Sequence, residues 1–217
     1  MKSFFSMFGK SAKELANPVN LVKVAMLIAI SMVLEMFTVE LPFAKVNFSF
    51  LANATIGMLF GPAVGLLSGL ACDIVGFIAH PTGSFMPVYT LVAGLQGLIY
   101  GIVLYSKTNG QWMASAEEGG KTDAKGIKVS LFIRAVIARL LDVVIINLLI
   151  NTKLNLYFGY IHADSYSAAI VARVVKNALE LAADLPLLFI ILPAALVAHK
   201  KTGGFKNKTK PAEAAGS

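Results

Sequence analysis

Charged residues are scarce in this sequence of 217 residues, of which they make up only 14%. Soluble domains carry about a quarter, so this chain has too few charges to cover a surface that faces water. Its single cysteine, Cys72, excludes a disulfide within the chain. The three histidines lie too far apart in sequence to have metal-ligand spacing, so no metal site is predicted.

Catalytic patterns are also missing. The sequence has no glycine-rich loop ending in Gly-Lys-Ser/Thr, so we do not expect this chain to hydrolyse ATP itself. No pairing of a nucleophile with a base is visible either, and the sequence predicts no enzyme and no bound cofactor. The net charge of +7 comes from lysines in the tails and one loop rather than from a basic stripe with aromatics, which argues against nucleic-acid binding.

What the sequence does have is long apolar runs, with 57% hydrophobic residues overall. A membrane span needs about 20 mainly apolar residues. Six segments are predicted to be spans, of which the second is short: 19–39, 48–60, 63–79, 87–105, 129–157 and 168–199. We therefore predict an all-α membrane protein, a compact bundle of six transmembrane helices in one domain over residues 19–199. An amphipathic lead-in (1–18), a solvated loop (107–128) and a basic, disordered tail (200–217) complete the predicted organisation.

Lysine placement predicts the orientation, because loops on the cytoplasmic side carry an excess of Lys and Arg. With the N-terminus inside, the outer loops hold only Lys45 and Lys153. The inner segments hold the lysines at positions 2, 10, 13, 107, 121, 125, 128, 200, 201, 206, 208 and 210. Both termini are thus expected in the cytoplasm, which requires an even number of spans.

Small residues four positions apart predict tight helix packing in lipid. The glycine pairs are Gly57 and Gly61, Gly65 and Gly69, and Gly97 and Gly101, and the first span has the same pattern at Ala25 and Ala29.

Several ionisable groups lie inside the predicted spans, where each costs at least about 2.5–3.5 kcal/mol at the centre and therefore suggests a function. Arg139 and Asp142 are close enough on a helix to pair. The last span carries a polar stripe on one helical face: Arg173, Lys176, Asn177, Glu180 and Asp184. Internal ion pairs, Arg139–Asp142 and Lys176–Glu180, are the structural alternative to a function for these groups. Glu35 and Asp73 are further intramembrane carboxylates.

The polar groups of the outer half are expected at one level. The fifth span runs outward and the sixth inward, which brings Asn147 and Asn151 to the depth of Arg173, Lys176 and Asn177. The loop after the third span adds Thr82, Phe85 and Tyr89 at that level. Amides, two cations and aromatic rings together suit a flat, polar, anionic small molecule.

Successive blocks of the chain resemble the S components of energy-coupling factor (ECF) vitamin transporters, the folate type above all. The blocks are 47–51 (NFSFL), 57–62 (GMLFGP), 73–76 (DIVG), 81–87 (PTGSFMP), 97–101 (GLIYG), 146–152 (INLLINT) and 172–177 (ARVVKN). Their order and spacing extend the resemblance over residues 20–198. The insert at 107–128 and the pair Asn53-Ala54 depart from the family pattern.

The resemblance implies a subunit of the bacterial cell membrane that binds its vitamin from outside. It also implies partners, namely the transmembrane coupling subunit EcfT and two ECF ATPases, with Ala25 and Ala29 in the docking motif. Arg173 and Lys176 would hold ligand carboxylates, while Asn147, Asn151 and Asn177 would bind the ring. Phe85 or Tyr89 would stack on the ring, and the loops 41–50 (ending in Phe50) and 80–87 (with Thr82) would close over it.

Other interpretations remain open at this point. Pantothenate is anionic too, and pantothenate- and riboflavin-type S components share the fold. A stand-alone secondary carrier would use Asp73, Glu180 or Asp184 as titrating groups, although no internal repeat supports the usual two-half plan.

Overall fold

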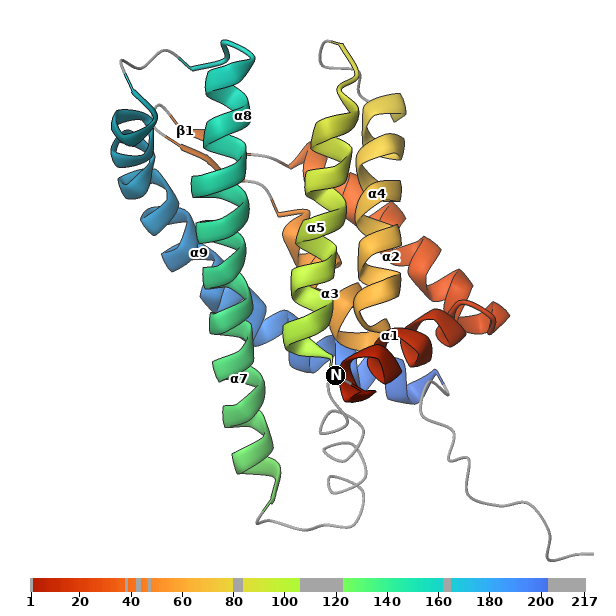
Figure 1. The fold of residues 1–217 in the computed structure, drawn as a ribbon. Coiled ribbons are helices and arrows are strands. Elements are labelled where there is room, and N and C mark those ends of the chain that lie inside the picture. Colours follow the sequence, from red (N-terminus) through yellow and green to blue (C-terminus); the bar gives the residue numbers. More distant parts are fainter. Residues whose placement is uncertain are drawn as a thin grey trace, which may run out of the picture.

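The computed structural model describes residues 2–37, 39–41, 44–46, 48–79, 84–105, 123–161 and 165–202, and these form a helical bundle (Figure 1). Four helices are long and apolar enough to cross a membrane: α2 (Pro18–Met36), α4 (Pro62–Ala79), α5 (Pro87–Leu104) and α9 (Tyr166–Lys201). A shorter apolar helix, α3 (Phe50–Phe60), lies among them. The predicted helical membrane bundle is confirmed.

The fifth predicted span is one continuous helical rod, built from α7 (Asp123–Leu141), the π-helix η1 (Asp142–Asn151) and α8 (Thr152–Tyr157). The rod begins earlier than the sequence indicated. Residues 123–128 were expected in a solvated loop, but the structure places them in the first turns of α7. The rest of that loop (107–122) and the basic tail from residue 203 lie outside the described residues.

Glycines bring α3, α4 and α5 into backbone contact. A Cβ added at Gly97 would lie 2.0 Å from the carbonyl oxygen of Gly65, and one at Gly69 would lie 2.3 Å from that of Ala93. No side chain fits in such a space, so these positions require glycine. The glycines spaced four residues apart therefore serve helix packing. The helices α3, α4 and α5 form the tightly packed half of the bundle.

A turn between α3 and α4 depends on Gly61, whose φ of +88° favours glycine over residues with a side chain. The next residue, Pro62, begins α4, where the missing N–H of proline costs nothing.

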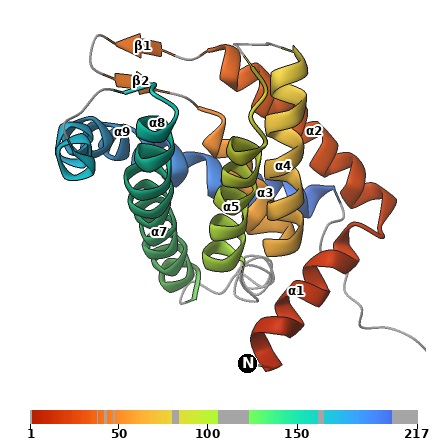
Figure 2. The ribbon, with the colours of Figure 1, turned by 45° about the horizontal axis from the view of Figure 1, so that its top comes forward.

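The two ends of the bundle differ. At one end, here called the outer end, a short antiparallel hairpin of β1 (Val39–Leu41) and β2 (Ala44–Val46) lies near α8 and the start of α9 (Figure 2). This hairpin was not predicted from the sequence. At the other end, the base, lie the helix α1 (Lys2–Glu14) and the end of α9 (Figure 1). The Nζ of Lys23 in α2 donates to the carbonyl oxygen of Thr202 (3.2 Å), which joins the two chain ends at the base.

Candidate functional site

A cavity of about 350 Å³ opens between α3, α5, η1 and α9. It lies in the half of the bundle away from the close glycine contacts. This volume falls in the lower part of the range of ligand sites, roughly 300–1,000 Å³. Its lining is mainly polar or charged: Ser49, Phe50, Asp73, Tyr89, Val92, Ala93, Gln96, Arg139, Ile146, Asn147, Asn151, Arg173, Lys176, Asn177, Glu180 and Asp184. Seven of the nine ligand-binding residues expected from the sequence are among them.

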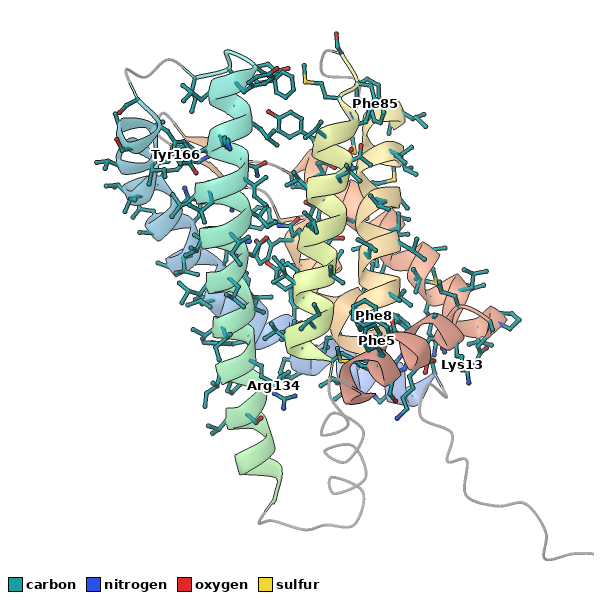
Figure 3. The ribbon with its side chains drawn as sticks, in the orientation of Figure 1. Phe5, Phe8, Lys13, Phe85, Arg134 and Tyr166 are labelled. Carbon is teal, nitrogen blue, oxygen red and sulfur yellow. The ribbon has the colours of Figure 1, made fainter. Side chains whose placement is uncertain are left out.

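Two predicted residues are not brought to the cavity. Phe85 does not line it; its ring packs against Phe77 with centroids 5.1 Å apart, at the outer end of α4 (Figure 3). Thr82 lies outside the described residues.

The polar stripe of α9 forms one wall. Lys176 pairs with Glu180 at 3.3 Å, as the sequence suggested. Arg173 instead donates to the hydroxyl of Thr152 at 3.0 Å. Within the part of the chain that the structure describes, Arg173 forms no ion pair, so no carboxylate contacts its guanidinium directly. This guanidinium can therefore receive an anionic group of a ligand.

The facing wall comes from η1. A π-helix is wider than an α-helix and often marks a functional site. Here it carries Asn147 and Asn151, whose side chains share a hydrogen bond of 3.3 Å, and both line the cavity. The Oδ1 of Asn151 is buried and accepts no hydrogen bond from any described residue. A buried acceptor without a donor is costly, so this atom is suited to a donor on a ligand.

Aromatic rings frame the cavity at two depths. Near the outer end, Tyr89 donates to the Oδ1 of Asn155 at 2.6 Å and stands beside Phe158 and Tyr160, with ring centroids 6.2 and 6.5 Å away. Deeper down, the buried ring of Phe50 lies 4.3 Å from the guanidinium carbon of Arg139. A flat ligand between these depths would meet aromatic faces at both.

Arg139 forms the floor of the cavity. It is buried and forms ion pairs with two aspartates, Asp142 on its own rod and Asp184 on α9. Its Nε donates to the Oδ2 of Asp184 at 3.0 Å, and its Nη1 to the hydroxyl of Tyr100 at 3.2 Å. The predicted pair of Arg139 with Asp142 is confirmed, but the sequence did not predict that Asp184 shares the same guanidinium.

The aspartates of this floor keep unused acceptors. Gln96 and Tyr100 of α5 donate to the Oδ2 of Asp142 at 3.0 and 3.2 Å. The Oδ1 atoms of Asp142 and Asp184 are buried and accept no hydrogen bond from the described residues. Because Asp184 lines the cavity, its Oδ1 can accept a hydrogen bond from a ligand N–H.

Sequence reasoning missed three features of the lining. Gln96 was not singled out, although a glutamine inside an apolar run of α5 was a usable signal. Asp73 was noted as an intramembrane charge but not as a ligand-binding residue; it lines the cavity and accepts from the hydroxyl of Thr90 at 2.6 Å. The third feature is the position of Asp184 in the cavity wall. The periodicity of α9 alone does not show which neighbouring helix the side chain of Asp184 faces.

Comparisons with known proteins agree with this geometry. The model of the family described as "ECF transporter, substrate-specific component" matches residues 19–192. The folate transporter FolT of Clostridium novyi is 26% identical over 161 residues, which are 73% of this chain and 79% of that protein. FolT of Leuconostoc mesenteroides is 24% identical over 180 residues, or 82% and 86% of the two chains. FolT of Streptococcus mutans is 33% identical over 94 residues, or 42% and 50%.

A solved structure of FolT bound with folic acid has the same fold. It aligns with a TM-score of 0.64 over 83% of this chain and 98% of the other, at 23% sequence identity.

The floor of the cavity predicts a large loss of stability on removal of its cation. Arg139→Ala leaves two buried aspartates without a counter-charge, and breaking a buried pair in this way typically costs about 3–5 kcal/mol. We expect a marked drop in the thermal midpoint of the protein in detergent, measured by size-exclusion chromatography after heating. Arg134→Ala, five residues earlier on α7 (Figure 3), is the matched control and should shift the midpoint little. Equal midpoints for the two variants would show that the floor is not held by Arg139.

Proposed function

The chain belongs to the family of ECF transporter substrate-specific components, and from this premise we propose that it captures folate on the outside of the bacterial membrane for import. It is a multi-pass protein of that membrane, and it serves as the binding subunit of an importer. The observation that carries the choice of an anionic ligand is Arg173, a cavity-lining guanidinium without an ion pair among the described residues. The folate transporters among its relatives support the choice of vitamin.

The chemistry of the cavity suits the two ends of folate. Its glutamate end carries two carboxylates, which match Arg173 and Lys176 on α9. Arginine offers a forked pair of donors and lysine a point charge, so one carboxylate can bind in a bidentate manner and the other through a single contact. Neutralising the ligand in this way lowers the cost of taking two negative charges out of water.

The pterin end is flat, with N–H donors on one edge and acceptors on the others. Asp184 has a buried acceptor without a donor among the described residues, and Gln96 offers an amide next to it. These groups at the floor suit the pterin, with the ring of Phe50 above Arg139 as a stacking surface. Amides at middle depth, on Asn147, Asn151 and Asn177, would bind the rest of the ligand, and Tyr89 would cover it from the outer end.

The importing step requires partners that this chain does not contain. In the proposed assembly, the transmembrane coupling subunit EcfT and two ECF ATPases supply the energy, and this chain catalyses no reaction. Ala25 and Ala29 are both exposed on α2, one turn apart, where they make a smooth surface against which another helix can pack. This face is the proposed docking site for the coupling subunit.

Calorimetry with folate, pantothenate and riboflavin tests the substrate. For the purified chain in detergent, we expect folate to bind with a dissociation constant on the order of nM, roughly −12 kcal/mol. The other two vitamins should bind far more weakly, because neither matches both a dicarboxylate end and a pterin edge. Tight binding of pantothenate or riboflavin instead would reject folate, and binding of none of them would reject capture of these vitamins.

Arg173→Ala should weaken folate binding by about 2 kcal/mol or more, roughly 30-fold, since a charge-assisted hydrogen bond in a partly dry site is lost. Calorimetry measures the change. Lys153→Ala removes an exposed cation that does not line the cavity and should leave the affinity as it is. If both variants bind folate as the unaltered chain does, Arg173 is not in the site.

Bulky substitutions on the exposed face of α2 test the docking site. Ala25→Phe combined with Ala29→Phe should abolish co-purification with the coupling subunit while folate still binds, because α2 contributes no residue to the cavity lining. The control, Ala182→Phe with Ala183→Phe, adds the same bulk at two exposed positions of α9. Co-purification that survives the double substitution would place the docking site elsewhere.

A further inference from the structure

The helix α1 has two chemically different exposed flanks. Phe5, Phe8 and Ala12 follow the spacing i, i+3, i+7 and share one side, and Ser6, Lys10 and Lys13 follow i, i+4, i+7 and share another. The ring of Phe5 is 71% exposed, and the side chains of Lys10 and Lys13 are exposed as well. An apolar flank next to a cationic flank on one short helix is the composition of helices that lie in a membrane surface.

The orientation of α1 about its own axis is fixed by a third side, which faces the bundle. The hydroxyl of Ser11 is fully buried and makes three hydrogen bonds. It donates to the carbonyl oxygen of Phe60 (2.7 Å) and accepts from the backbone N–H groups of Ala63 (3.0 Å) and Val64 (3.1 Å). Ser11 thereby supplies acceptors for the first N–H groups of α4, which no residue within that helix can satisfy.

A second contact fixes the far end of α1. The side-chain amide of Asn20, in the first turn of α2, donates to the Oε2 of Glu14 at 2.7 Å. Glu14, the one acidic residue of α1, is thus turned toward α2, while Lys10 and Lys13 remain on the exposed flank. With both contacts in place, the rotation of α1 about its own axis is fixed.

The bilayer reaches the level of α1. The membrane-crossing helix α2 begins at Pro18, four residues after α1 ends at Glu14, and α1 lies at the base of the bundle (Figure 3). Exposed Lys201, at the end of α9, belongs to the same end of the molecule. Lysines at this depth meet the lipid headgroups, and anionic headgroups attract clustered basic residues.

We infer that α1 is an interfacial helix that binds anionic phospholipid headgroups of the leaflet at the base of the bundle. Phe5 inserts among the upper acyl carbons, with Phe8 beside it, and Lys10 and Lys13 bind the phosphates. Because Ser11 ties α1 to the junction of α3 and α4, the lipid contact acts on the helix bundle itself. This inference concerns the membrane rather than the vitamin and is independent of the proposed substrate.

Tryptophan fluorescence of the full chain in nanodiscs tests the insertion. The single tryptophan, Trp112, is first replaced by Phe, and a probe is then introduced as Phe5→Trp or, as the matched control on the cationic flank, Ser6→Trp. The discs contain phosphatidylcholine alone or mixed with phosphatidylglycerol, with lipids brominated on the upper acyl carbons as quenchers. We expect a blue-shifted, quenched emission for the probe at position 5 and little quenching at position 6.

The headgroup part of the inference has its own readout. Quenching at position 5 should be stronger in discs with phosphatidylglycerol, and Lys10→Glu with Lys13→Glu should remove that difference. Lys153→Glu, at the other end of the bundle, should retain it. Equal quenching at positions 5 and 6, no quenching at position 5, or quenching that ignores the lipid charge would each overturn the inference; the second result would fit a protein partner on α1 instead.

Discussion

The buried guanidinium of Arg139 is the group on which the site depends. It forms ion pairs with Asp142 on its own rod and with Asp184 on α9, and through Tyr100 and Asp142 it is linked to α5. In a membrane, none of these charges could remain unpaired without a cost of several kcal/mol. The network therefore fixes the positions of the α7–η1 rod and of α9 relative to α5, and these helices form walls of the cavity.

The two halves of the bundle are packed differently. Around Gly65 and Gly97 the backbones touch, and no space remains for a ligand. Around the π-helix η1, the wider turn carries Asn147 and Asn151 toward α9, and polar side chains line about 350 Å³. A rigid half next to a polar, open half lets a small membrane protein hold a ligand without a large water-filled opening. The buried acceptors of Asn151 and Asp184 show where such a ligand would complete the hydrogen bonding.

The two faces proposed to meet other molecules are separate from the cavity. The exposed alanines of α2 offer a flat surface to a partner helix, whereas α1 offers charge and an aromatic ring to the membrane surface. The proposed capture, docking and anchoring thus involve different residues, which allows each to be altered without the others. Ser11 connects α1 to the turn at Gly61, so the anchoring helix is part of the fold rather than an appendage.

The sequence by itself determined the helical membrane class, because hydrophobic runs depend only on local composition. The six spans and the orientation, which rest on the same runs and on lysine placement, stay predictions. It also placed Arg173 to Asp184 on one stripe of α9, since helical periodicity is local. Only the tertiary structure decided that Asp184 shares Arg139, that Gln96 lines the cavity, and that Phe85 packs on Phe77 instead. It also decided that η1 is a π-helix and that Ser11 caps α4. These features join residues up to 53 positions apart, or depend on how neighbouring helices pack, and no local pattern encodes such partners.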